Sequence, residues 1–436
     1  MGTQLVRTGQ SLTGLQKLTD YIMRIFKKSF SRNKNEGPSK PRVIFVSHEA
    51  TRTGAPKIIL NLLSHFAEHC EVACESILLS GGHLAKDFQN HSVVDCLNLT
   101  NQDREGIRKR VRSFVGRYQD QTPTLAVCNS MESRFITEEL DAMGVPCVSL
   151  VHELPSGYDA SDYQHVYSVS KKVIFPVDFV RKAANQLAPL PVEKTLVLPQ
   201  GLLTPDFGLR VCREEAQENL REELGIPSDA FVVLGCGTLD LRKGIDHFVN
   251  IARVVCEAQR AERPIHFVWV GEGARWAHSL YHYLQLDLAN TPAKDNVHFI
   301  GERSNVEQYF VGADCFLMSS RVDPFPCVIH EAMAASLPVI AFAGAGGAPE
   351  AIADGAGFVL PYADYGQVAA TIRLMRDQPG VTIGIRDRAL QRVRQKYQFH
   401  DYAEKVIDVC ELVTGTEMRR GVAPSETFEL RLHRAA

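Results

Sequence analysis

The sequence predicts an α/β protein built from two doubly wound, mostly parallel domains. Three observations indicate this fold class. At 436 residues the chain is too long for one comfortable hydrophobic core. Its composition of 45% hydrophobic and 23% charged residues is that of an ordinary soluble protein. Short apolar runs alternate with helical stretches in two successive series, which is the pattern of a parallel sheet covered on both faces.

The first series begins at Arg42. The run RVIFVSH predicts a buried strand, and a polar loop, EATRTG, leads into an apolar helix, APKIILNLLSHFA. Strand, glycine loop and helix in this order open a βαβ unit. Further strands are expected at TLAVCNS, VPCVSLVHE, KKVIFPV and TLVLPQG. We therefore predict a first domain over residues 41–205.

A charged helical stretch, REEAQENLREELGI, leads to the second series. Six runs predict its strands: AFVVLGCG, IHFVWVGEG, NVHFIG, ADCFLMSS, LPVIAFAG and GFVLPY. We predict a second domain over 206–395 and a C-terminal helix over 396–415 that packs back towards the first domain. The polar, arginine-containing segment 416–436 lacks periodicity and is expected to be a flexible tail.

Residues 1–40 differ from the rest. Apolar residues at helical spacing share the segment with basic ones, the former being Leu15, Leu18, Ile22, Ile25 and Phe26 and the latter Lys17, Arg24, Lys27 and Lys28. This pattern predicts an amphipathic basic helix, followed by the linker NEGPSKP. Two interpretations stay open: the helix packs on its own domain, or residues 11–30 adsorb reversibly to an anionic membrane surface.

Charge and cysteine usage narrow the partners and the compartment. The formal net charge of -3 gives no global field that recruits nucleic acid, so an anionic ligand must be held by local basic groups. The 11 cysteines form no CxxC pair, which favours reduced thiols and a cytoplasmic location. We find neither a signal-peptide core nor a run of about 18 apolar residues, so an integral membrane protein is not expected.

Two acids bracket the stretch DPFPCVIHE. Pro324 and Pro326 are compatible with a first helical turn, which places Asp323 at or just before the helix start and Glu331 about one and a half turns further on. The neighbours of Glu331 are apolar, and an unpaired carboxylate buried there would cost several kcal/mol. Hydroxyl groups of a ligand would satisfy it. The alternative makes Asp323 an N-cap and Glu331 a solvated helix residue.

Basic and glycine-rich segments complete the candidate site. In LRKGID, Arg242 and Lys243 precede a helix N-terminus, which suits a diphosphate, although a solvated loop pair is the alternative. GCGTLD and GEGARW lack the third glycine of a nicotinamide fingerprint. In FAGAGGAPEAI, Gly346 and Gly347 either let a ligand approach the backbone or only form a tight turn.

The order of these segments, above all DPFPCVIHEAMAASLPVIAFAGAGGAPEAI, resembles the acid-x7-acid signature of the retaining nucleotide-sugar glycosyltransferases of family 4 (glycosyl transferases group 1). The resemblance covers roughly Arg42 to Thr416. It implies the GT-B fold, in which two Rossmann-like domains face each other across a cleft. The first domain would then bind the acceptor and the second the nucleotide sugar.

The resemblance also implies roles for individual residues. Glu331 would hold the ribose hydroxyls, Asp323 the hydroxyls of the donor sugar and Lys243 the diphosphate. This chain has Asp323 where the family usually has Glu, and Thr238 where it commonly has Arg, so we assign the second phosphate contact to Arg242. The remaining donor contacts are expected from Gly54, Phe325, Pro326, Cys327, Val328, Gly346 and Gly347. His152 in SLVHELPSG would line the cleft beside the sugar and acceptor, and His48 lies at a similar strand end.

The function implied is retaining transfer of a sugar from a nucleoside-diphosphate sugar to a glycan or lipid-linked acceptor, in surface polysaccharide biosynthesis. No cofactor and no metal are expected, because the cations and helix amides stabilise the leaving diphosphate and the chain has no Asp-x-Asp pair. Alternatives are a catalytically silent subunit that binds a sugar nucleotide, or another enzyme of the same fold such as a sugar phosphorylase or an epimerase. The expected location is the cytoplasm, including its membrane face.

Overall fold

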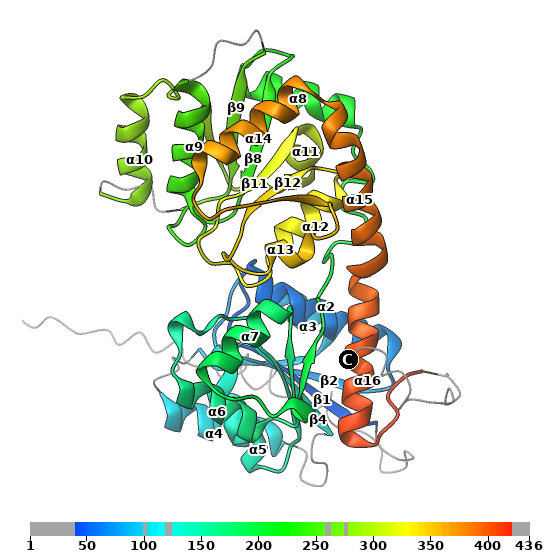
Figure 1. Ribbon diagram of the computed structural model, residues 1–436. Coiled ribbons are helices and arrows are strands. Elements are labelled where there is room, and N and C mark those ends of the chain that lie inside the picture. The colour runs from blue at the N-terminus through cyan, green and yellow to red at the C-terminus, as the bar shows by residue number, and fades with distance from the viewer. Residues whose placement is uncertain (1–39, 99–102, 118–123, 258–262, 274–277, 421–436) are drawn as a thin grey trace, which may run out of the picture. The chain divides into compact units, whose positions relative to one another are not determined.

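The first sheet organises the amino-terminal half of the chain. The computed structural model describes residues 40–98, 103–117, 124–257, 263–273 and 278–420, and the chain from Pro41 onward forms one compact unit (Figure 1). Its first sheet has the order β3-β2-β1-β4-β5-β6-β7, and every strand pair in it is parallel. The strands are β1 (Arg42–Ser47), β2 (Ala73–Leu78), β3 (Val93–Cys96), β4 (Leu125–Asn129), β5 (Cys147–Leu150), β6 (Lys172–Phe175) and β7 (Thr195–Val197). The helices between them are α2 (Gly54–His69), α3 (Ala85–His91), α4 (Arg104–Val115), α5 (Arg134–Ala142), α6 (Ala160–Val169) and α7 (Asp178–Leu187).

The second sheet repeats the design. Its order is β10-β9-β8-β11-β12-β13, again with parallel pairs only. The strands are β8 (Phe231–Cys236), β9 (Ile265–Val270), β10 (Val297–Gly301), β11 (Cys315–Met318), β12 (Val339–Phe342) and β13 (Gly357–Leu360). The helices are α8 (Arg213–Leu224), α9 (Ile245–Glu257), α10 (Leu280–Ala289), α11 (Val306–Gly312), α12 (Cys327–Ala334), α13 (Ala348–Ala351), α14 (Tyr365–Asp377), α15 (Gly380–Lys396) and α16 (Phe399–Thr414). Two doubly wound parallel sheets confirm the predicted fold class.

All six apolar runs predicted in the second half form strands. Those inside the sheet are buried, whereas the edge strands β10 and β13 are partly exposed. In the first half the sequence analysis did not anticipate β2 and β3. Glu75 interrupts the apolar run of β2, but it is buried against the guanidinium of Arg42 in β1, with nitrogen to oxygen distances of 2.9 and 3.0 Å. β3 is a short, partly exposed edge strand. β2 therefore lacks a clear strand signal in the sequence because it contains a charge that is paired inside the sheet. β3 lacks one because it is short and partly exposed.

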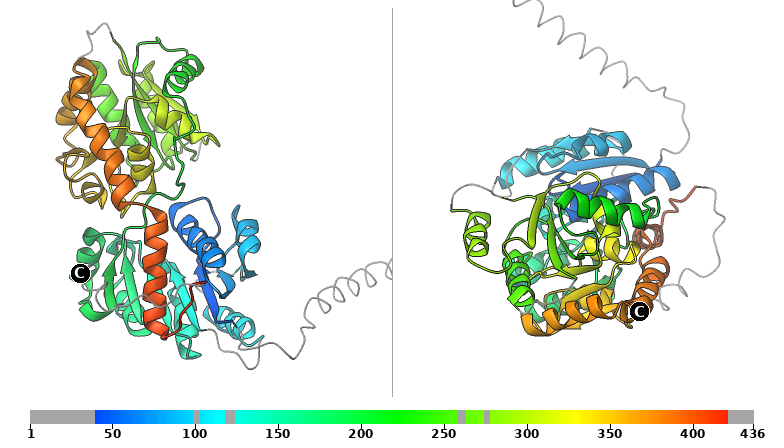
Figure 2. Two further views of the ribbon diagram at one scale, coloured as in Figure 1. Left: turned by 90° about the vertical axis from the view of Figure 1, so that its right-hand side faces the viewer. Right: turned by 90° about the horizontal axis from the view of Figure 1, so that it is seen from above.

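The last two helices connect the halves. α15 packs on α12 and α14 of the second half, and α16 packs on α2 of the first (Figures 1 and 2). Phe399, Tyr402 and Val406 of α16 are buried in one hydrophobic cluster with Phe66 of α2. The chain thus returns to the first sheet after it has completed the second. Within the described ranges, none of the helices is long and apolar enough to cross a bilayer.

Residues Thr416–Arg420, which the sequence analysis placed in a flexible tail, are packed instead, and this corrects that expectation. Met418 is fully buried, and the backbone of Arg419 forms a bridge with Cys70. The Arg419 guanidinium meets the carboxylates of Glu404, Asp408 and Glu411 on α16. Arg419 of this polar segment therefore forms ion pairs with α16. The predicted basic helix within residues 11–30 and its linker lie outside the described residues.

Candidate functional site

The charged residues of the candidate site lie where the order of the second sheet reverses. β8 is flanked by β9 and β11, and ligands of doubly wound sheets bind beside the carboxyl ends of such strands. The loop after β8 carries Arg242 and Lys243, and α9 begins directly after Gly244, as predicted. Gly244 has φ +68°, and a Cβ there would lie 1.9 Å from the Ser319 carbonyl oxygen, which is in the loop after β11. Only glycine lets the two loops lie this close together.

Asp323 and the two cations form one ion cluster. Asp323 is 6% exposed, and its Oδ2 accepts a hydrogen bond from Lys243 Nζ at 2.5 Å. Arg242 Nη1 is 4.0 Å from the same oxygen and donates to the Val322 carbonyl at 3.3 Å. The side chain of Lys243 is 14% exposed and that of Arg242 is 50% exposed. Lys243 is therefore not a freely solvated loop residue.

The helix of the acidic signature begins later than the sequence analysis expected. α12 starts at Cys327, with Pro326 as an extended N-cap, so neither proline lies in the first helical turn and Asp323 is not the N-cap. A residue before proline avoids the helical region, so the two prolines disfavour a helix at Asp323 and Phe325. Asp323 also pairs with the glycine turn, its amide donating to the Ala345 carbonyl at 2.9 Å. Glu331 is the fifth residue of α12, about one turn in.

The glycine turn after β12 packs against the backbone of this signature. A Cβ on Gly346 would lie 1.7 Å from the Asp323 carbonyl oxygen, and one on Gly347 would lie 2.4 Å from that of Pro324. These contacts within the protein account for both glycines, in line with the tight-turn alternative. Their contact with a donor stays a prediction.

Glu331 is half-buried, and no described residue donates a hydrogen bond to its carboxylate. Burial raises the pKa of Glu331, and the positive charges of Lys57 on α2 and Lys243 oppose that rise. Two cations therefore act to lower the pKa of this carboxylate, while its oxygen atoms accept no hydrogen bond from the described residues. Lys57, which is part of the apolar run APKIILNLLSHFA, was not among the predicted site residues.

The polar residues of the first half also lie at a strand-order reversal, between β1 and β4. Ser47 pairs with Asn129 in the sheet, so the loops that follow the two strands start side by side. His152 Nε2 donates to Asn129 Oδ1 across 2.9 Å, and Asn129 Nδ2 donates to the Ala55 carbonyl at 3.0 Å. Burial lowers the pKa of His152. The imidazole is thus neutral at pH 7, with Nδ1 as its acceptor nitrogen.

Three polar residues that the sequence analysis missed take part. Asn129 orients His152, and the carboxylate of Glu153 accepts from the Ser130 hydroxyl and from the amides of Met131 and His152. Gln200 Nε2 donates to the Phe325 carbonyl at 3.0 Å, while its buried Oε1 has no partner among the described residues. Asn129 lies near the carboxyl end of the predicted run TLAVCNS and Glu153 ends the predicted run VPCVSLVHE, which was a usable signal. No pattern singles out Gln200.

A cavity of ≈ 350 Å³ brings most of these side chains together, a size that suits a small-molecule ligand. Its lining comes from both halves: His48, Thr53, Gly54, Ala55, Ile58, His152, Glu153, Pro176, Gln200, Arg242, Lys243, Asp323, Pro324, Phe325, Pro326, Cys327 and Val328. Glu331, Gly346 and Gly347 are not among the lining residues. The fold thus brings most of the predicted site residues together around one cavity. The roles of these residues stay predictions.

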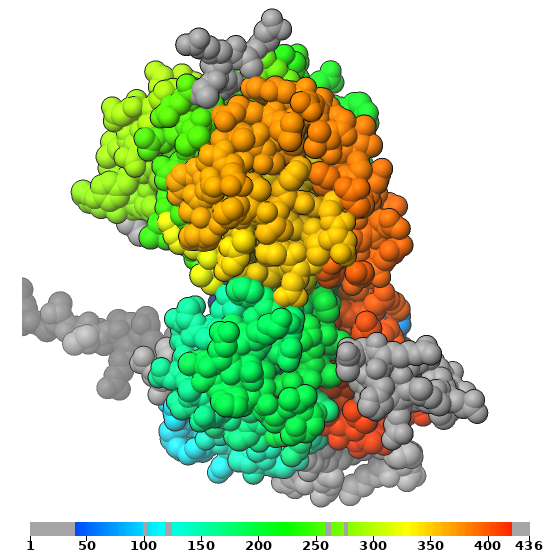
Figure 3. Space-filling view, in the orientation of Figure 1, coloured from blue at the N-terminus to red at the C-terminus, as the bar shows by residue number. Residues whose placement is uncertain are grey.

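The two halves also meet directly at α7 and α13. The Glu350 carboxylate accepts from the amides of Asp178 and Phe179 at 3.1 and 2.6 Å, so an acid of the second half caps a helix of the first. In Figure 3 the green surface of the first half touches the yellow surface of the second. A carboxylate at a helix N-terminus is favourable because of the helix dipole.

A family model matches most of the second half. Residues 216–395 match the model described as glycosyl transferases group 1. The matched residues include Lys243, Asp323 and Glu331, on which the resemblance rested.

The curated relatives of the chain are distant and are matched only in part. The lipopolysaccharide core biosynthesis glycosyltransferase LpsD of Rhizobium meliloti (strain 1021) is 26% identical over 190 residues, 43% of this chain and 52% of LpsD. The uncharacterized glycosyltransferase MJ1607 of Methanocaldococcus jannaschii is 23% identical over 266 residues, 60% of this chain and 65% of that protein. The chain thus spans about half to two thirds of the length of these curated relatives.

Solved structures agree in fold. Anabaena Alr3699/HepE, in a crystal structure with UDP and glucose, has a TM-score of 0.72 at 19% identity, covering 85% of this chain and 100% of that one. Together with the two facing doubly wound sheets, the likeness confirms the GT-B fold.

Proposed function

We propose that the chain is a glycosyltransferase that moves a sugar from a nucleoside-diphosphate sugar to a glycan or lipid-linked acceptor, in surface polysaccharide biosynthesis. The observation that carries this proposal is the cavity in which Lys243, Arg242 and Asp323 lie together at the strand-order reversal. Its opposite wall includes Gly54, the first residue of α2. The lipopolysaccharide core function in the name of LpsD supports the proposed class of product.

The chemistry follows from where charge develops. As the sugar departs, negative charge builds on the diphosphate, and preorganised donors at that position lower the barrier. Lys243 and Arg242 supply cations, and the first amides of α2 add the positive end of a helix dipole. Asp323 accepts from sugar hydroxyls, and neutral His152 accepts through Nδ1. We propose that this set acts without a metal ion and, as the resemblance to family 4 implies, with retention of configuration.

The test starts with the donor. Full-length protein is screened by thermal shift against nucleoside diphosphates and their sugars, beginning with UDP and UDP-glucose because Alr3699/HepE structures contain them. Hits then enter donor hydrolysis assays with and without EDTA. We expect a stabilising nucleotide and slow hydrolysis that EDTA does not abolish. A panel without any stabilising nucleotide contradicts the proposal, and binding without hydrolysis or transfer indicates the silent subunit.

We also propose a cytoplasmic protein that contacts the inner face of the membrane through residues 11–30. The eleven free cysteines support the compartment. Each Lys or Arg near an anionic surface contributes about 1 kcal/mol. Flotation with anionic vesicles at low salt should therefore carry the intact chain and leave a chain lacking residues 1–40 behind. Equal behaviour of the two chains contradicts the membrane contact.

A further inference from the structure

The end of α2 remote from the cavity carries a cluster of imidazoles. His65 and His69 lie one turn apart on α2 and face His400 and Glu404, which lie one turn apart on α16. Gly54, at the cavity, precedes His65 by eleven residues, which corresponds to about 16 Å along the helix. The cluster is therefore separate from the proposed donor site.

The ligand-type atoms of this cluster converge. His65 Nε2 lies 2.8 Å from Glu404 Oε1, and one such atom from each of His65, His400 and Glu404 lies within 4.8 Å of the other two. The ring centroid of His65 is 4.3 Å from that of His69 and 5.2 Å from that of His400. The centroids of His69 and His400 are 6.1 Å apart. Three potential ligand atoms thus converge between the two helices, and the ring of His69 lies beside them.

We propose that His65, His400 and Glu404, with His69 as a further ligand, bind a Zn²⁺ ion. Imidazole nitrogens with one carboxylate are ligands that Zn²⁺ takes in a tetrahedral site, whereas Mg²⁺ and Ca²⁺ prefer oxygen ligands. The i, i+4 spacing on each helix presents both side chains of a pair on one face. Two such pairs on facing helices place three convergent ligands and the further imidazole of His69 at one crossing.

The distances fit this ion after small side-chain movements. With ligand bonds of about 2.0–2.2 Å, neighbouring ligand atoms of a tetrahedral zinc site lie roughly 3.3–3.6 Å apart. His65 Nε2 and Glu404 Oε1, at 2.8 Å, must separate slightly, and atoms up to 4.8 Å apart must approach. His69 and His400 are exposed, so their rings are free to rotate and the ion has access from solvent.

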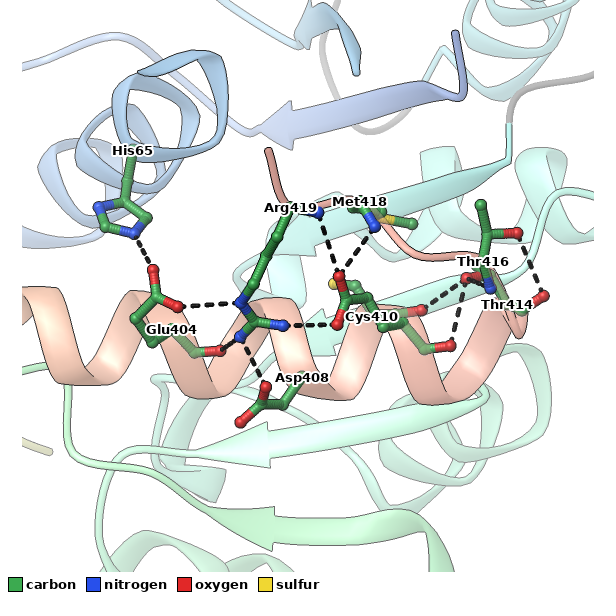
Figure 4. Close-up of polar contacts among 9 residues, drawn as sticks. His65, Glu404, Asp408, Cys410, Thr414, Thr416, Met418 and Arg419 are labelled. Carbon is green, nitrogen blue, oxygen red and sulfur yellow. Dashed lines mark hydrogen bonds and ion pairs between the residues drawn. The ribbon is translucent and has the colours of Figure 1, made fainter. Parts of the chain in front are cut away.

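The surroundings of Glu404 favour the carboxylate. Arg419 Nε donates to its Oε2 at 3.0 Å and leaves Oε1 directed at His65 (Figure 4). A hydrogen bond of this kind to a ligating group orients it and commonly contributes to metal affinity. Although its own burial favours the neutral form, the hydrogen bonds from His65 and Arg419 lower the pKa of Glu404.

The consequence concerns the connection between the halves. α16 follows the second sheet in the chain but packs on α2, which begins at the cavity. Zn²⁺ held by both helices joins them at this crossing. Because an ion that binds only the folded state stabilises it, the thermal midpoint should rise with Zn²⁺ concentration.

The test uses full-length, tag-free protein stripped of metal. Zn²⁺ is titrated by calorimetry, and Co²⁺ reports geometry because a tetrahedral site absorbs strongly in the visible range. The main variant is His400→Ala, since His400 is exposed on α16 and its removal leaves the core intact. The matched control is His298→Ala, which removes a ring from the His266–His298 pair, where the centroids are 5.3 Å apart.

We expect one equivalent of Zn²⁺ to bind the wild type, with a tetrahedral Co²⁺ spectrum and a higher thermal midpoint. Loss of a group that only hydrogen-bonds to a metal ligand already costs roughly 10–100-fold in metal affinity, so His400→Ala and Glu404→Gln should each weaken binding at least about tenfold. The His298→Ala control should match the wild type. Equal binding by wild type and His400→Ala, or weak binding of several equivalents with octahedral Co²⁺, overturns the proposal. Donor affinity is also measured with and without Zn²⁺. An unchanged affinity shows that the zinc site and the proposed donor site are separate.

Discussion

The two strand-order reversals of this molecule occupy equivalent positions but differ in charge. In the second half Lys243, Arg242 and Asp323 form an ion cluster. In the first half His152 and Asn129 are joined by a hydrogen bond between neutral groups. Parallel topology alone fixes where both sets lie, since each follows the central strands of its sheet.

The difference shows how one topology supplies two kinds of chemistry. Cations are suited to a diphosphate, whose charge grows as the sugar leaves. A neutral imidazole with a fixed tautomer is suited to a hydroxyl group, because it accepts a hydrogen bond without a net charge. The comparison predicts that charge removal in the second half costs more turnover than loss of orientation in the first.

Lys243→Met tests the charged side and should have the largest effect. Losing one preorganised electrostatic donor costs about 10²–10³-fold in turnover. The methionine keeps the apolar stem but leaves Asp323 without its closest cation, so the thermal midpoint is measured alongside steady-state turnover of the donor.

The matched control for this variant is Lys396→Met, because Lys396 also faces an aspartate, Asp354, at 3.8 Å but lies on α15 away from the cavity. It should turn over donor like the wild type. A folded Lys243→Met protein that keeps its turnover within about threefold, far less than one preorganised donor is worth, would contradict the role of Lys243.

The charged side is also the side that the sequence predicts best. The residues in and beside the ion cluster leave a pattern: two acids with seven residues between them, and two cations beside a glycine. The predicted helix start was wrong, since α12 begins at Cys327. A residue before proline disfavours the helical region, so Pro324 and Pro326 already carried this information in the sequence.

The neutral side is poorly visible in the sequence. Asn129 ends an apolar strand like many other polar residues, and its role depends on His152 and Ala55, which become neighbours only in the folded sheet. Gln200 lies after β7, and only the tertiary structure brings it to Phe325. The sequence pattern placed Arg419 in a flexible tail. Its three carboxylate partners lie 8–15 residues earlier, on a helix, so local composition does not reveal the ion pairs.

Glu331→Gln tests the acid that lies beside the charged cluster, and its expected effect is intermediate. If Glu331 holds the ribose hydroxyls, loss of hydrogen bonds to a charged group weakens nucleotide binding by roughly 1.5–3 kcal/mol. Calorimetry with the nucleotide identified in the donor screen measures this. Glu223→Gln, at a half-exposed acid paired with Arg303, is the matched control and should bind normally.

The pKa of Glu331 gives this prediction a second readout. Burial raises the pKa of Glu331 above its ordinary value, so the folded protein takes up a proton at a higher pH than the unfolded chain. The free energy of unfolding contributed by this group therefore falls as pH rises through that window. Glu331→Gln should raise the thermal midpoint of the free protein at pH 7 while it weakens nucleotide binding. A variant that is less stable and binds normally would show a structural role instead.

Asn129→Ala tests the neutral side and should have the smallest effect. The substitution removes the acceptor that holds His152 Nε2 and the donor to the Ala55 carbonyl, and one hydrogen bond between neutral groups contributes about 0.5–1.5 kcal/mol. Turnover should fall roughly two- to tenfold. Asn61→Ala, which also removes an amide donor to a backbone carbonyl, that of Leu203, is the control and should leave turnover unchanged.

Asn129→Asp adds a negative charge beside His152, which raises the pKa of the imidazole. The acid limb of the plot of turnover against pH should therefore move to higher pH. An acid limb that stays in place in Asn129→Asp would show that the protonation of His152 does not control turnover.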